Sequence, residues 1–180
     1  MLWDAASAKE VRTLSGCEGG VRAVAFTPDG RRLLSGGVGG VVQLWDVETG
    51  QELRAYRDQG GVAQAIAVTP DGRRFLSGSY DSSFFLRDIE SGETLWRVEA
   101  QDDQILCVAV TPDGVRAATG ETEGTIALWD IASGSLLERV AVGEGVSITC
   151  LAISSDGRWL LAGTRDGRLP CWDLSLSESK

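Results

Sequence analysis

The stretch that decides the fold is "TPDG" at residues 27–30, which returns as "TPDG" at 69–72 and 111–114 and as "SSDG" at 154–157. The copies are 42, 42 and 43 residues apart, counted from their first residues. A second marker keeps the same spacing and is occupied by Trp45, Arg87, Trp129 and Trp172. Self-similarity at a constant period of this length is typical of repeat architectures. The chain therefore consists of four similar units.

Each unit has the pattern of four short strands. Between the markers, apolar residues alternate or form short runs bounded by Gly, Pro, Asp and Ser, as in strands. In the first unit the predicted strands are 21–26, 32–35, 41–45 and 52–56. The "TPDG" segment predicts a tight turn between the first two, because Pro presets φ and Gly permits the exit.

Small and large residues alternate along the first strand of each unit, as in Ala23-Val24-Ala25-Phe26. When the four units are aligned, some positions of this strand are small in every unit and others are large in every unit. The small positions indicate crowding by neighbouring backbone, and the large positions indicate a core. Strands gathered round a central axis produce that combination. We therefore predict an all-β fold, a β-propeller of four-stranded antiparallel blades with four blades per chain.

The units resemble the WD-repeat family. The resemblance rests on "LWD", "TPDG", "LLSGG" and "DVETGQELR" at constant spacing over residues 2–173. It implies a propeller that serves as a platform for protein complexes, without catalysis. It also implies a single domain of residues 1–180 with repeats at about 15–56, 57–98, 99–140 and 141–173.

The chain departs from the family in having no histidine. The family's Gly-His pair would fall at 16–17, 58–59, 100–101 and 143–144. The buried hydrogen-bond network that joins His to a turn Asp, a strand Ser or Thr, and Trp is therefore incomplete. Its remaining members are Asp81, Asp166, Ser35, Ser77 and Thr119, and Arg87 replaces the second Trp. We expect the fold to persist, because one net hydrogen bond contributes only about 1 kcal/mol.

The chain begins with a marker that ends a unit, "LWD" at 2–4. Residues 9–14 then match the fourth strand of a unit, whereas the last unit stops after three strands at Trp172-Asp173. We expect residues 9–14 to complete the last sheet, within one chain or across two. Pro170 lies in the third strand of that unit, where it removes a ladder donor. Pro170 is either a tolerated local defect or a sign that the pairing between this strand and the N-terminal strand is weak and exchangeable.

Four units leave the mode of ring closure open. If the blades are equally spaced, each blade is rotated from the previous one by about 90° in a ring of four blades and by about 45° in a ring of eight. The units have small residues inside and bulky residues outside, which favours the smaller rotation of about 45° between blades. We therefore expect a homodimer that builds one eight-bladed ring. A compact four-bladed monomer and a piece cut from a longer array are the alternatives.

Composition limits the classes of partner. The 180 residues are 43% hydrophobic and 24% charged, as in a globular domain. The net charge of −9 opposes binding to nucleic acid or to anionic lipid. No apolar run approaches the roughly 18 residues of a membrane span, and the N-terminus lacks the pattern of a signal peptide. We expect a cytoplasmic protein.

No motif for catalysis, cofactor binding or metal binding is present. Without histidine there is no Ser-His-Asp triad or Cys-His pair. Cys17, Cys107, Cys150 and Cys171 lack paired spacing and are expected to be free, buried thiols, with Cys17 an inert loop thiol. The Gly-rich segment 35–40 lacks phosphate-loop spacing. The alternative to a non-catalytic scaffold is a propeller enzyme with a carboxylate or metal site on the central axis.

Candidate partner-binding residues are those that vary between units on the loops before the first strand and after the second. These positions resemble the contact sites of the family and would take a protein or peptide ligand. They are Arg22, Gln64, Leu106 and Thr149 in the first set, and Val38, Tyr80, Thr122 and Arg165 in the second. Tyr80 and Arg165 are the strongest candidates, because aromatic and Arg side chains dominate interface energies. Phe84 and Phe85, near Arg87, mark either a lateral contact patch or packing between neighbouring sheets.

Overall fold

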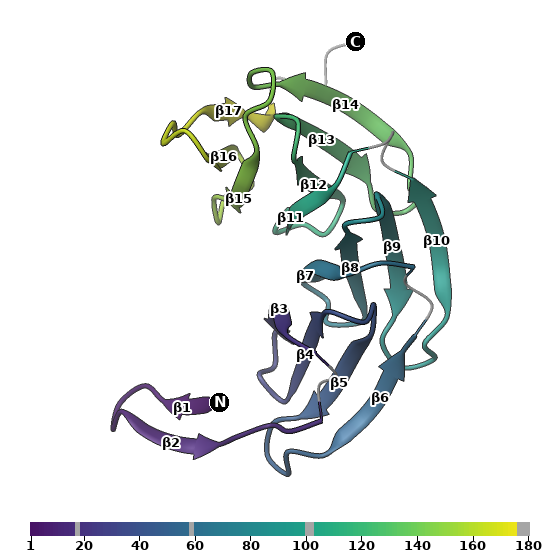
Figure 1. The fold of residues 1–180 in the computed structure, drawn as a ribbon, viewed down its shortest axis with the longest axis vertical. Coiled ribbons are helices and arrows are strands. Elements are labelled where there is room, and N and C mark those ends of the chain that lie inside the picture. The colour runs from purple at the N-terminus through teal and green to yellow at the C-terminus, as the bar shows by residue number, and fades with distance from the viewer. Residues whose placement is uncertain (17–18, 58–59, 100–102, 176–180) are drawn as a thin grey trace.

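The computed structural model of the protein describes residues 1–16, 19–57, 60–99 and 103–175. These residues form seventeen strands in five antiparallel sheets (Figure 1). Within the described residues, no helix has the length and apolar character needed to cross a membrane. The all-β prediction is confirmed.

Three sheets are complete four-stranded blades. Blade 1 consists of β3 (Val21–Phe26), β4 (Arg32–Gly37), β5 (Val42–Asp46) and β6 (Glu52–Tyr56). Blade 2 consists of β7 (Ala63–Val68), β8 (Arg74–Ser79), β9 (Ser83–Asp88) and β10 (Thr94–Glu99). Blade 3 consists of β11 (Ile105–Val110), β12 (Arg116–Glu121), β13 (Thr125–Asp130) and β14 (Leu136–Ala141). Each blade is a meander, so sequence neighbours pair within it.

The two remaining sheets are incomplete. Blade 4 has three strands, which are β15 (Ile148–Ile153), β16 (Trp159–Thr164) and β17 (Cys171–Asp173). The N-terminal hairpin has two, which are β1 (Leu2–Asp4) and β2 (Lys9–Arg12). The five sheets follow an open arc with β3, β7, β11 and β15 on its inner side and β6, β10 and β14 on its outer side (Figure 1). This arrangement is that of propeller blades.

The turn between the first two strands of a blade is closed by a threonine and an aspartate. In blade 1 the Thr27 hydroxyl donates to Asp29 Oδ1 at 2.6 Å, and the same carboxylate oxygen accepts the Arg31 N–H at 3.0 Å. Gly30 leaves the turn at a φ of +68°, which favours glycine. The same bonds recur at Thr69 and Thr111, so the "TPDG" marker is a structural device.

Ser82 occupies a left-handed position that the other units give to glycine. Its φ is +67°, against +68° for Gly40, +84° for Gly124 and +87° for Gly167. A side chain costs roughly 1 kcal/mol in this region. Ser82→Gly is therefore expected to raise the free energy of unfolding by about 0.5–1 kcal/mol, measured by urea denaturation. Ser91→Gly, in an exposed turn, is the control, and an equal gain there would contradict the explanation.

The core lies between the blades. Three buried clusters separate blades 1 and 2, blades 2 and 3, and blades 3 and 4. Between blades 1 and 2, the large residues Ile66 and Val68 of one first strand share a cluster with the small residues Ala23 and Ala25 of the preceding first strand. At this contact, the large residues of one first strand and the small residues of the other therefore pack on facing sides of the two blades.

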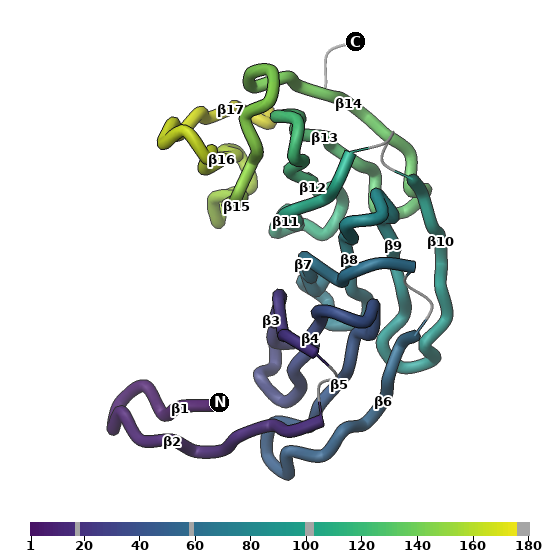
Figure 2. Tube along the Cα trace, viewed as in Figure 1, coloured from purple at the N-terminus to yellow at the C-terminus, as the bar shows by residue number. Residues whose placement is uncertain are grey.

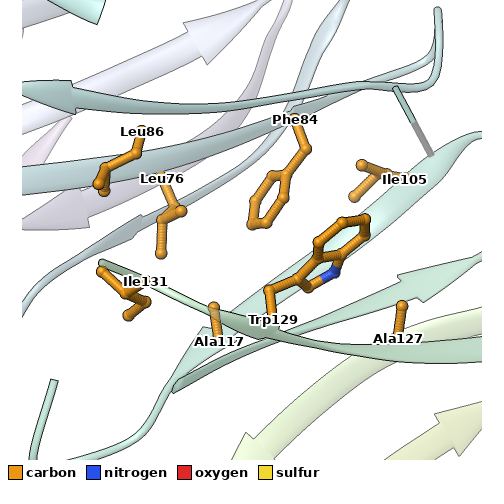
Figure 3. Close-up of a cluster of buried hydrophobic side chains, with 8 residues drawn as sticks. All are labelled: Leu76, Phe84, Leu86, Ile105, Ala117, Ala127, Trp129 and Ile131. Atoms are coloured by element: carbon orange, nitrogen blue, oxygen red, sulfur yellow. The ribbon is translucent and has the colours of Figure 1, made fainter. Parts of the chain in front are cut away.

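Phe84 and Phe85 belong to this packing. Phe84 lies in the cluster between blades 2 and 3, beside Trp129 (Figure 3). Its ring centroid is 5.5 Å from that of Trp129 and 5.4 Å from that of Trp96. Phe85 is buried on the opposite face, beside the guanidinium of Arg87 at 4.7 Å. The prediction of a lateral contact patch is wrong, because Phe84 and Phe85 are both buried. As adjacent residues of one strand, they point to opposite faces of the blade, and each face packs on a neighbouring blade.

The chain does not close on itself. Within one chain, β2 does not complete blade 4 but pairs with β1, through Glu10 opposite Trp3 and Lys9 opposite Asp4. The hairpin and β17 lie at opposite ends of the arc, so the alternative of a compact four-bladed monomer is wrong (Figure 2). The physical reason is the gentle turn from blade to blade, together with the low entropic cost of closing a short hairpin loop. Completion of blade 4 across two chains stays a prediction.

The N-terminal hairpin occupies the place of the outer half of a blade. Arg12 donates to the carbonyl oxygen of Glu48 at 2.8 Å and also to that of Thr49, in the outer turn of blade 1. Arg54, the equivalent residue of blade 1, donates to Glu90 O at 2.9 Å in the outer turn of blade 2. The hairpin is therefore docked on blade 1 as blade 1 is docked on blade 2.

Candidate interaction surface

A β-bulge marks the start of the innermost strand in all four blades. The pairing shifts between Val21 and Ala23 in β3, and at the equivalent place in β7, β11 and β15. The extra residues at these bulges are Arg22, Gln64, Leu106 and Thr149. A bulge re-aims a side chain and is frequent next to functional sites. The first predicted set therefore consists of the bulge residues.

The second predicted set lies directly beside the first. Its members are the first residues after β4, β8, β12 and β16, and each N–H donates to a carbonyl two residues before the bulge. The bonds run from Val38 to Gly20 at 3.0 Å, Tyr80 to Val62 at 3.2 Å, Thr122 to Gln104 at 3.1 Å and Arg165 to Ser147 at 3.0 Å. The structure thus brings both sets together at the same end of every blade.

These side chains differ in their availability to a partner. Tyr80 is 37% exposed and Val38 is 43% exposed, and Arg22, Arg165 and Thr149 are exposed as well. Thr149 uses its hydroxyl within the blade, donating to Gly163 O at 3.0 Å. The hydroxyl of Thr122 likewise donates to the buried carboxylate of Asp103.

Gln64 is half-buried and carries an unsatisfied acceptor. Its Oε1 has no hydrogen-bond partner among the described residues, although the atom is shielded from solvent. An unsatisfied buried acceptor costs about 1–3 kcal/mol. A partner that supplied an N–H or O–H here would recover that cost.

Beneath the surface, blade 3 contains a buried polar cluster. In blade 3 the fully buried carboxylate of Glu121 forms an ion pair with Arg139. Burial raises the pKa of Glu121 in spite of this neighbour. Asp103 fixes the loop after β12 by accepting the N–H groups of Thr122 at 3.1 Å and of Glu123 at 3.0 Å. Sequence reasoning missed both acids, because their partners are 18–20 residues away along the chain.

The family's polar network survives in part in blades 1 and 3. Trp45 Nε1 donates to the Ser35 hydroxyl at 2.8 Å, and Trp129 Nε1 donates to Thr119 at 3.0 Å. Of the positions predicted for the missing Gly-His pair, 17, 58–59 and 100–101 lie outside the described residues. In blade 1 the amide of Gln43 donates to Glu52 at 2.5 Å.

The cysteines correct one prediction. Cys107 is half-buried, and burial raises the pKa of its thiol to about 12, which keeps it protonated. Cys150 and Cys171 are free but exposed, not buried as predicted, because they lie on the face of blade 4 that no further blade covers. Cys17 lies outside the described residues. No group of three metal-ligating side chains occurs in the part of the chain that the structure describes.

The family model "WD domain, G-beta repeat" matches the chain four times, at residues 8–46, 50–88, 92–130 and 138–173. The chain belongs to the WD-repeat family. Each match begins on the outermost strand of one sheet and ends on the third strand of the next, so the first includes β2 and the last ends with β17. WD repeats build domains that serve protein interaction. The search of curated proteins gave no match.

Proposed function

We propose that this WD-repeat protein is a non-catalytic scaffold that binds a protein or peptide on the surface formed by the bulge residues and their neighbours. The observation that carries the proposal is that every blade presents two adjacent side chains at this place, and that their chemistry differs from blade to blade. The pairs are Arg22 with Val38, Gln64 with Tyr80, Leu106 with Thr122, and Thr149 with Arg165. A surface of this kind can recognise an extended, chemically varied ligand.

A binding function is favoured over catalysis on the central axis by the composition of the inner strands. The four strands read "VRAVAF", "AQAIAV", "ILCVAV" and "ITCLAI" and contain no carboxylate. Acid chemistry on the axis would need at least one pair of acids there. The net charge of −9 favours a protein over a nucleic acid or an anionic membrane. The free thiols suit a cytoplasmic location.

We further propose that two copies associate to close the ring. The three contacts between successive blades of the chain use equivalent residues. One end of the arc exposes one surface of this contact, and the other end exposes the complementary surface. In the proposed dimer, the exposed large apolar residues at the blade 1 end of one copy pack on the exposed small residues of blade 4 of the other copy. No cofactor is needed for either proposal.

Tyr80→Ala and Arg165→Ala test the binding surface. Both side chains are exposed and lie outside the clusters between the blades, so each variant is expected to keep the melting temperature of the parent. Each is expected to weaken a true partner by about 1–2 kcal/mol, or roughly ten-fold, measured by calorimetry with a partner captured on the intact protein. Leu53→Ala, on the outer rim, is the matched control. Lower melting temperatures for the Tyr80 and Arg165 variants, or an equal loss of binding for Leu53→Ala, would contradict the assignment.

A further inference from the structure

The two ends of the arc expose the residue columns that are buried at every internal contact. At the blade 1 end, Val21 is 49% exposed, whereas the equivalent residues Ala63, Ile105 and Ile148 are fully buried. At the blade 4 end, Leu169 is 67% exposed, whereas its equivalents Val42, Phe84 and Ile126 are at most 2% exposed. One end of a second copy therefore fits the other end of the first as successive blades fit within the chain.

Blade 4 also carries a slot for a strand. Among the described residues, no strand pairs with the outer edge of β17. This open edge and the facing side of β14 border two adjacent hollows of about 310 and 440 Å³. Val140 and Val142 line this slot from blade 3, and Trp172 lines it from blade 4. In blades 1 to 3 the fourth strand fills the equivalent place. An extended segment that pairs with β17 would satisfy the open edge and cover the apolar slot.

A count of strands shows that the ends cannot meet without a rearrangement. The described residues of one chain form seventeen strands, so two copies bring 34, whereas eight blades of four take 32. The excess arises because β1 and β17 are both third strands, each carrying Trp-Asp in register. When the hairpin of one copy meets blade 4 of another, β1 and β17 compete for the same edge of β2. One of them must leave.

β1 is the strand that is held more weakly. Trp3 is 56% exposed, and β2 is the only strand of the described residues that pairs with β1. β17 is anchored by Leu174, which is 2% exposed within the cluster between blades 3 and 4. The Leu174 N–H donates to Arg158 O at 2.7 Å, and its carbonyl accepts from Arg116 Nη1 at 3.1 Å. Displacing β17 would disturb the buried Leu174 side chain and its two hydrogen bonds, whereas displacing β1 leaves them in place.

We propose that β2 exchanges partners on assembly, leaving β1 of its own chain and pairing with β17 of a second copy. This inference rests on the self-association proposed above. The register follows from the observed one, in which Leu2 lies opposite Arg12, Trp3 opposite Glu10 and Asp4 opposite Lys9. Substituting the equivalent residues places Cys171 opposite Arg12, Trp172 opposite Glu10 and Asp173 opposite Lys9. The aspartate opposite Lys9 in the register is thereby retained. β1 acts as a removable cover for β2 in the single chain.

A disulfide that locks the hairpin tests the exchange. Trp3→Cys/Glu10→Cys places two cysteines directly opposite each other in β1 and β2. The expected result by light scattering is a two-chain mass for the parent and for the reduced variant, and a single-chain mass for the oxidised variant. Trp3→Cys alone is the control, because it lacks the second thiol. A two-chain mass for the oxidised, locked variant would overturn the exchange while leaving self-association in place. A single-chain mass for the parent at tens of micromolar would overturn both.

A second variant reads the new pairing directly and does not depend on the lock. Arg12→Cys is expected to form a disulfide with Cys171 of a second copy, giving a covalent dimer on a non-reducing gel. Arg12→Cys/Cys171→Ser is the matched control and is expected to give none. Covalent dimer in both variants, or in neither while the parent has a two-chain mass, would show that β2 does not lie beside β17.

Discussion

Arg139→Leu is expected to lower the free energy of unfolding by about 3 kcal/mol at neutral pH. Glu121 is fully buried, and the guanidinium of Arg139 is its ion-pair partner. Removing one partner of a buried pair leaves an uncompensated charge, which typically costs 3–5 kcal/mol. The lower end applies because the Arg139 side chain is 24% exposed, so water reaches the pair. Urea denaturation of parent and variant measures the difference.

The pH dependence of this loss identifies its cause. Burial already raises the pKa of Glu121, and Arg139 opposes that rise. In the variant the pKa rises further. A carboxyl group with a raised pKa in the folded state stabilises the fold at low pH, and that contribution is lost as pH rises through the folded pKa. The deficit of Arg139→Leu is therefore largest at pH 7 and above, and shrinks as the pH is lowered towards 5.

Blade 2 provides a matched control for this variant. Arg97 occupies the position of Arg139 on the fourth strand, opposite Phe85 where blade 3 has Ala127. Its ion pair with Glu99 is exposed on both sides, so Arg97→Leu is expected to cost less than about 1 kcal/mol. Arg139→Leu/Glu121→Leu is expected to recover most of the loss. Equal costs for the two single variants, or a deficit that does not change with pH, would rule out the buried charge as the cause.

The sequence was sufficient for the elements that repeat. A turn such as Thr27-Pro28-Asp29-Gly30 is stabilised by bonds between near neighbours, so its residues identify it wherever they occur. The strands between such turns follow from their apolar pattern, and the observed bounds differ from the predicted ones by no more than two residues in blade 1. The equivalence of the four units then placed the candidate residues at the same end of each blade.

The features that sequence reasoning missed depend on pairing between distant residues. A bulge such as that at Arg22 appears only when the register against β4 is known. The pair of Glu121 and Arg139 occurs in one blade only, so no repetition pointed to it. The N-terminal hairpin was missed for a different reason, since residues 2–4 were identified as a unit ending but not as a strand. A four-residue loop closes at little entropic cost, so local pairing with β1 prevails in the single chain.

Phe84→Ala is expected to lower the free energy of unfolding by about 4 kcal/mol. The ring is fully buried between blades 2 and 3, in contact with Trp96 and Trp129. Truncating a buried Phe to Ala costs about 3–5 kcal/mol, because the transfer free energy of the ring is lost and a cavity remains. Two aromatic partners place this site towards the upper half of that range. Thermal and urea denaturation measure the loss.

Leu169→Ala is the matched variant, because Leu169 holds the equivalent position in blade 4, where no further blade covers it. In the single chain it is 67% exposed, so its truncation is expected to change the free energy of unfolding by less than about 0.5 kcal/mol. In the proposed two-chain ring the same residue would be buried against blade 1 of the second copy, and its truncation is expected to weaken association about ten-fold or more. Denaturation at nanomolar concentration and light scattering at micromolar concentration separate the two effects. A large loss of stability for Leu169→Ala in the single chain would mean that another part of the same chain covers this face. An unchanged association constant would mean that this face of blade 4 is not the contact between the two copies. The position held by Phe84 in blade 2 and by Leu169 in blade 4 would then stabilise the contact between blades of one chain but not the contact between chains.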